Sequence, residues 1–127
     1  MELQIKINET KAGFFVVVLK GPLDTTTFSS FEKTLNRILV STTKAIVLDM
    51  GGVNYISSLG VGSVFKAVKT MNQHKGSLVV INLQPQIKKV FEIAKLLPDA
   101  VFKNIKEADE YLDQIQRKIA VERRSLI

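Results

Sequence analysis

The first twenty residues carry two strand-like hydrophobic patterns. Leu3, Ile5 and Ile7 alternate with polar residues, which predicts a strand with one buried face. After turn residues at 11–13, a continuous run of β-branched and aromatic residues extends over Phe14–Leu19, as is typical of a more central strand. Because only a short turn separates the two segments, we expect them to form a β-hairpin.

From residue 28 onward, helix-like and strand-like patterns alternate. Apolar residues recur at helical spacing in four segments, and short apolar runs lie between those segments. The pattern predicts helices near 28–39, 61–73, 85–94 and 108–119, and strands at 45–49, 78–81 and 100–102. Strands that alternate with helices need parallel crossovers. The predicted fold class is therefore α/β, with a mixed, mostly parallel sheet, an antiparallel edge hairpin and four flanking helices.

The same periodicity selects a hydrophobic core. Positions that fall on the apolar stripe of a helix or within an apolar strand are expected to face the interior. Ten of them form the predicted core: Phe28, Phe31, Leu35, Val47, Val64, Phe65, Val68, Val80, Val90 and Phe91.

The composition excludes several classes of functional site and of partner. The chain has 127 residues, no Cys and one His, which excludes disulfides, thiol nucleophiles, cysteine-based metal sites and multi-histidine centres. The net charge of +6 is spread along the chain without a nucleic-acid-binding motif, so we expect a solvated surface and no nucleic-acid partner. The longest apolar stretch, Gly13–Leu19, is too short to cross a membrane, and no signal peptide is visible. We expect a cytoplasmic protein without cofactor, metal or membrane insertion.

Two junctions between a strand and a helix are unusual, at residues 21–24 and 51–60. Ligands of α/β folds gather at such junctions, yet neither segment matches a dinucleotide fingerprint, a phosphate loop or a nucleophile elbow. Asp24 and Asp49 are explained by turn and capping roles, and His74 by a surface or capping role at the far end of the helix from Ser58. We therefore predict no catalytic residues and no enzyme.

Ser57 and Ser58 precede the second predicted helix. A serine at this place caps free backbone N–H groups, which is the simpler interpretation for at least one of them. A helix N-terminus also stabilises an added phosphate. A phosphorylation site is therefore the functional alternative.

Five segments follow one another at Gly21–Asp24, Ala45–Asp49, Val53–Gly62, Gly76–Val80 and Pro85–Phe91. They resemble the STAS domain, and more narrowly the free-standing bacterial anti-sigma factor antagonists. The family carries G-x-L-D, then I-V-L-D, then F-M-D-S-S-G-L-G, which correspond to the first three segments, and the likeness continues through the last two. The likeness extends over about residues 2–113. We therefore expect a STAS-like domain at 1–113, followed at 114–127 by an extension of the C-terminal helix.

The resemblance implies a regulatory module that binds a kinase-like anti-sigma factor. In such proteins the kinase phosphorylates the Ser or Thr just before the glycine, and the phosphate abolishes binding. At that position this sequence has Leu59, which accepts no phosphate, and Ser57 replaces the acidic residue of the family. Ser58 is then the fallback phosphorylation site. The family's docking surface corresponds to Asp24, Ser57, Ser58, Leu59, Gly60 and Val61.

Two alternatives stay open. One is a scaffold or accessory STAS domain in a stress-signalling or lipid-transport complex, which Leu59 favours because some such relatives lack the phosphorylatable residue. The other concerns the last residues, where Ile115, Ile119 and Val121 either belong to a frayed end or contact a partner or a second copy in a weak homodimer.

Overall fold

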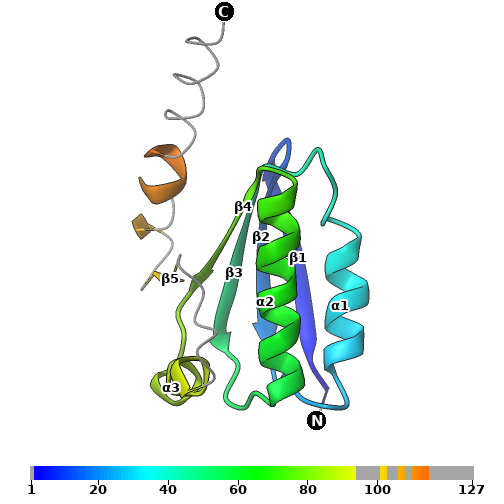
Figure 1. Cartoon of the computed structure of the whole chain (residues 1–127), viewed down its shortest axis with the longest axis vertical. Helices are drawn as coiled ribbons and strands as arrows, with labels where there is room; N and C mark the ends of the chain where they lie inside the picture. Colours follow the sequence, from blue (N-terminus) through cyan, green and yellow to red (C-terminus); the bar gives the residue numbers. More distant parts are fainter. Residues whose placement is uncertain (1, 94–100, 103–105, 108–109, 115–127) are drawn as a thin grey trace, which may run out of the picture.

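The structure is a computed structural model that describes residues 2–93, 101–102, 106–107 and 110–114. Its five-stranded sheet has the strand order β1-β2-β3-β4-β5, antiparallel between β1 and β2 and parallel elsewhere. This confirms the predicted α/β class and the mixed sheet (Figure 1). The strands are β1 (Gln4–Lys11), β2 (Phe14–Lys20), β3 (Ala45–Gly52), β4 (Ser77–Ile81) and β5 (Val101–Phe102), and the helices are α1 (Phe28–Asn36), α2 (Ser58–Gln73) and α3 (Pro85–Ile93).

The edge hairpin forms as predicted. Strands β1 and β2 pair in antiparallel register, with Ile5 opposite Leu19 and Ile7 opposite Val17. Gly13 in the connecting turn has φ 82°, a backbone conformation that glycine adopts without steric cost. The hairpin thereby places β2 beside β3.

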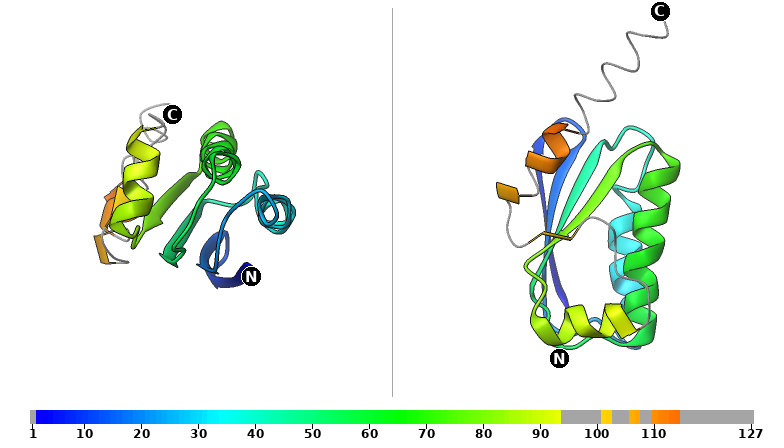
Figure 2. Two further views of the ribbon diagram at one scale, coloured as in Figure 1. Left: turned by 90° about the horizontal axis from the view of Figure 1, so that it is seen from below. Right: turned by 60° about the vertical axis from the view of Figure 1, so that its left-hand side comes forward.

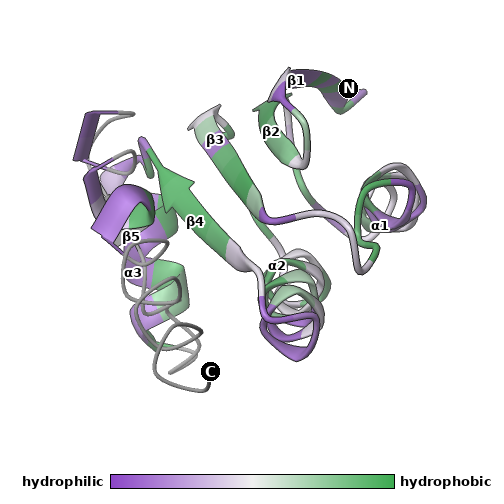
Figure 3. Ribbon diagram, turned by 90° about the horizontal axis from the view of Figure 1, so that it is seen from above, coloured by the Kyte–Doolittle hydropathy of each residue, from purple (hydrophilic) through white to green (hydrophobic). Residues whose placement is uncertain are grey.

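Helices α1 and α2 lie side by side on one face of the sheet, while α3 crosses the end at which the parallel strands finish (Figure 2). The hydrophilic sides of α1 and α2 face away from the sheet (Figure 3). Alternate residues of β3 supply two cores, because Ile46 and Leu48 belong to the main hydrophobic cluster and Ala45 and Val47 to a second one. Such burial on both faces explains the continuous apolar run of this strand.

Most of the predicted core is buried. The residues with little exposed surface are Phe31, Leu35, Val47, Val64, Val80 and Phe91, and those partly buried against the main cluster are Phe28, Val68 and Val90. The prediction for Phe65 is wrong, since its side chain is only half-buried and lies outside both clusters. Val64 faces the sheet, and the next residue of a helix is turned by about 100° from it.

Several boundaries differ from the periodicity. Strand β1 continues to Lys11, beyond the alternating segment that ends at Ile7, and α2 begins at Ser58 instead of near residue 61. Helix α1 ends at Asn36, although Ile38 is still buried and Leu39 packs against the core. Strand β3 continues three residues beyond Asp49 because Gly52 pairs with Lys20 of β2. The junction before α2 is therefore shorter than predicted.

The C-terminal part is described only in pieces. Residues 106–107 and 110–114 are helical, and Leu112 is buried in the second cluster. Four predicted positions, Ala108, Ile115, Ile119 and Val121, lie outside the described residues. Among the residues that are described, no helix is both long and apolar enough to cross a bilayer.

Candidate functional site

The two unusual junctions of the sequence meet in the structure. A parallel bridge joins Leu23 to Ile56. The Leu23 backbone N–H donates to the carbonyl oxygen of Tyr55, and the Ser57 N–H donates to that of Leu23, both at 3.0 Å. The loop before α1 and the loop before α2 are thus held together at the end of the sheet. Asp24 and Ser57 lie on these loops, and the other four predicted site residues follow in the first turn of α2.

Asp24 organises the turn that precedes α1. Its Oδ1 accepts hydrogen bonds from the Thr26 hydroxyl at 2.7 Å, the Thr26 backbone N–H at 2.9 Å and the Thr27 N–H at 3.1 Å. These bonds, those from Thr26 first, hold the pKa of Asp24 below its ordinary value. The Thr27 hydroxyl accepts in return from the Asp24 N–H at 2.9 Å. The predicted turn role of Asp24 is confirmed, whereas the N-cap of α1 is Thr27, with no side-chain capping hydrogen bond.

Ser57 is the N-cap of α2, because its Oγ accepts a hydrogen bond from the Gly60 backbone N–H at 3.2 Å. Ser58 is the first residue of the helix and is exposed. The Leu59 side chain is 47% exposed. The exposed side chain of Leu59 and the exposed hydroxyl of Ser58 therefore lie together in the first turn of α2, next to the predicted serine cap.

Gly60 and Val61 belong to the interior. A Cβ on Gly60 would press against the carbonyl oxygen of Leu23, so glycine is what allows the two loops to approach closely. Val61 is 1% exposed and packs in the main cluster. The expectation that Val61 belongs to a partner-binding surface is wrong, because the helix turns this position toward the sheet.

Sequence reasoning missed Tyr55, whose side chain is 57% exposed beside the same helix terminus. Val53, two residues before it, and Ile56, the next residue, are both buried, whereas Asn54 and Tyr55 between them are exposed. An aromatic residue in the segment between a predicted strand and a predicted helix is the signal that could have found it. Tyr55 and Leu59 thus give this end of the molecule two exposed apolar side chains.

The remaining candidates have structural roles. Asp49 Oδ1 accepts from the Gly51 N–H at 2.9 Å and from the Asn82 side-chain amide at 3.2 Å, which ties the last residues of β3 to the residue that follows β4. His74 is the C-cap of α2, about 24 Å along the helix from Ser58 at 1.5 Å per residue. In the described part of the chain, no three His, Cys, Asp or Glu residues form a group that could hold a metal ion.

Comparisons with known proteins agree with this architecture. The STAS domain family matches residues 6–108. BtrV of Bordetella bronchiseptica, which carries the name of an anti-sigma factor antagonist, is 31% identical over 96 residues that cover 76% of this chain and 83% of BtrV. The anti-sigma-B factor antagonist of Staphylococcus aureus is 29% identical over 96 residues, which cover 76% of this chain and 88% of that protein.

Solved structures share the fold. SpoIIAA, an anti-sigma factor antagonist in its unphosphorylated form, superimposes with a TM-score of 0.68 at 18% identity, covering 89% of this chain and 98% of SpoIIAA. The murine anion transporter Slc26a9 gives a TM-score of 0.72 at 20% identity, covering 84% of this chain and 18% of the transporter. The family match covers the sheet through β5 together with α1, α2 and α3, and BtrV is matched over most of its length. The chain therefore belongs to the STAS domain family.

Proposed function

We propose that this STAS domain is a non-catalytic binding module of the anti-sigma factor antagonist kind, which acts in the cytoplasm. Its partner is an anti-sigma factor or a related serine-kinase regulator. The names of the two relatives, which match this chain over most of their own length, support this assignment. The domain spans about residues 1–113 in this proposal, and residues 114–127 are an extension.

The observation that carries the proposal is the exposed first turn of α2. Leu59 is 47% exposed and Tyr55 is 57% exposed, while Ser58 lies between them in sequence and is exposed as well. Burial of an apolar side chain in a complex contributes about 0.8 kcal/mol per CH₂ group. We infer that the partner covers Leu59, with Asp24 and Ser57 shaping the loops beneath it and Gly60 permitting their close approach.

Leu59 also bears on regulation. A phosphate on a residue that a partner covers adds repulsion and a desolvation cost, but leucine has no hydroxyl to carry it. In this proposal, binding is therefore not gated at position 59. Ser58 offers an exposed hydroxyl one residue earlier and is the fallback phosphorylation site.

The test compares Leu59→Asp with Val40→Asp, measured as affinity for the anti-sigma factors of the source organism. Val40 is 42% exposed and precedes the start of β3, whereas Leu59 follows the end of that strand. A charge buried without a partner at an interface weakens binding by 2 kcal/mol or more, so we expect Leu59→Asp to lose at least about 30-fold in affinity and Val40→Asp less than about 2-fold. Normal affinity of Leu59→Asp, with both variants folded by circular dichroism, would refute the docking surface.

Phosphorylation is tested separately by intact-mass analysis. After incubation with the anti-sigma factor kinase, we expect no phosphate at Leu59 of the wild-type protein and one added phosphate on the Leu59→Ser variant. If the wild-type protein gains a phosphate that Ser58→Ala does not, Ser58 is the modified residue.

Leu59 favours a second candidate, a scaffold or accessory STAS domain in a stress-signalling or lipid-transport complex. The two candidates differ in what is retained on the purified native protein. An anti-sigma kinase supports the first, whereas signalling-complex or transport subunits support the second.

A further inference from the structure

The outer stripe of α2 joins one apolar residue to two lysines. Leu59, Gly62, Lys66, Lys69 and Gln73 recur at intervals of three and four residues and are all exposed. Such spacing places residues on one side of a helix. The buried residues of α2, such as Val61, Val64 and Met71, occupy the side that faces the sheet. The stripe is therefore the solvent face of the helix layer.

Helix α1 extends this face with more positive charge. Lys33 and the C-cap residue Arg37 are one turn apart and exposed, while Phe31 and Leu35 are buried. Because α1 and α2 lie side by side (Figure 1), four basic residues share one outer surface, which we call the basic face: Lys33, Arg37, Lys66 and Lys69.

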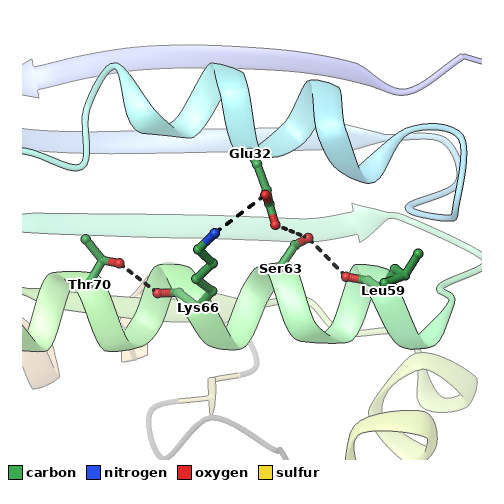
Figure 4. Close-up of polar contacts among 5 residues, drawn as sticks. All are labelled: Glu32, Leu59, Ser63, Lys66 and Thr70. Carbon is green, nitrogen blue, oxygen red and sulfur yellow. Dashed lines mark hydrogen bonds and ion pairs between the residues drawn. The ribbon is translucent and has the colours of Figure 1, made fainter.

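Glu32 is the acidic residue of these two helices, and it is engaged between them. The Ser63 hydroxyl, on a residue that is 3% exposed, donates to Glu32 Oε2 at 2.8 Å. Lys66 Nζ lies 3.8 Å from Glu32 Oε1 (Figure 4). The carboxylate thus satisfies a buried hydroxyl and one lysine. In the described part of the chain, Lys33, Arg37 and Lys69 form no ion pair.

From this arrangement we propose that the partner presents an acidic protein surface, which lies across the basic face while an apolar pocket receives Leu59. The inference rests on the proposed function and deepens it by giving the chemistry of the partner. Complementary charge steers association and selects among partners. The other charges of α1 and α2 do not cancel the basic face, because Glu32 is the one acidic residue against four basic ones.

The same face fits other polyanions less well. A nucleic-acid backbone offers no apolar pocket for Leu59, and the four basic residues belong to no nucleic-acid-binding motif. Insertion into an anionic membrane needs a continuous apolar helix face, whereas this stripe has one apolar residue followed by Gly62 and two lysines. An acidic protein surface satisfies both the charges and Leu59.

The test reverses two charges on the basic face and two elsewhere. Lys33→Glu/Lys69→Glu removes exposed lysines of α1 and α2, and Lys6→Glu/Lys44→Glu makes the same change of net charge in β1 and in the residue before β3. Against the anti-sigma factor, we expect the first double variant to lose at least about 10-fold in affinity and the second less than about 3-fold. Raising the salt concentration from about 50 to about 300 mM should weaken the wild type more than the first variant. Equal losses in both double variants would overturn the inference.

A second measurement does not depend on finding the anti-sigma factor. The ¹⁵N-labelled full chain is titrated with a helical peptide rich in Glu and Leu, and with its counterpart in which each Glu is Lys. We expect backbone shifts confined to α1 and α2, around Leu59 and the four residues of the basic face, with the acidic peptide alone. Equal shifts with both peptides would overturn the inference of an acidic protein partner. So would binding through Lys33 and Lys69 to phosphatidylglycerol vesicles or duplex DNA that is tighter than binding to the acidic peptide.

Failure of the two proposals is distinguishable. If Leu59→Asp abolishes binding while the charge reversals have no effect, the proposed function stands and the acidic partner is wrong. If no anti-sigma factor binds but the acidic peptide shifts the backbone signals of α1 and α2, the proposed function is wrong and the preference for an acidic partner stands.

Discussion

At the scale of single residues, Phe91 and Phe65 carry the same side chain in different surroundings. Phe91 is fully buried in the main cluster, whereas Phe65 is half-buried. Truncating a buried phenylalanine removes its transfer free energy and leaves a cavity. We expect Phe91→Ala to lower the free energy of unfolding by about 3–5 kcal/mol and Phe65→Ala by about 1–2 kcal/mol, as measured by urea denaturation. Similar losses in both variants would show that the half-burial of Phe65 is misassigned.

At the scale of the element, the first turns of α2 contain two glycines with opposite surroundings. A Cβ on Gly60 would meet the Leu23 carbonyl oxygen and, at 2.9 Å, Ile56 Cγ1, whereas a Cβ on Gly62 would have nothing within 4 Å. Gly60→Ala must therefore separate the two loops, and we expect it to cost about 2 kcal/mol or more of unfolding free energy. Gly62→Ala should stabilise α2 by up to about 1 kcal/mol, because alanine has the higher helix propensity. Thermal denaturation measures both, and a neutral Gly60→Ala would contradict the close approach.

At the scale of the whole molecule, we expect the domain to be complete by Gln114. The family match ends at residue 108, and Leu112 is the last buried side chain among the described residues. A chain truncated after Gln114 should keep its unfolding free energy within about 0.5 kcal/mol, because removing residues outside the packed core rarely changes stability by more. Calorimetry and light scattering check stability and oligomeric state. A loss of either would show that Ile115, Ile119 or Val121 makes contacts, as the alternative interpretation holds.

The secondary structure and the helix cap were predictable from the sequence because they depend on residues close together along the chain. The edge hairpin, the alternation of strands with helices and the Ser57 cap follow from period-two and period-3.6 burial and from a serine next to free N–H groups. The motifs around Asp24, Ala45–Asp49 and Val53–Gly62 also indicated the STAS family. The sequence by itself therefore determined the fold class and the position of the candidate site along the chain.

Only the tertiary structure decided how the site is built. The bridge between Leu23 and Ile56 joins the two loops, and the bond between Ser63 and Glu32 crosses from α2 to α1 over 31 residues of sequence. The burial of Val61 and the half-burial of Phe65 likewise depend on how α2 is rotated against the sheet. Hydrophobic periodicity defines a face only to within about one residue step of 100°, and a close approach between distant segments leaves no periodic signal. Which side chains are exposed at the candidate site is for that reason a property of the packed molecule.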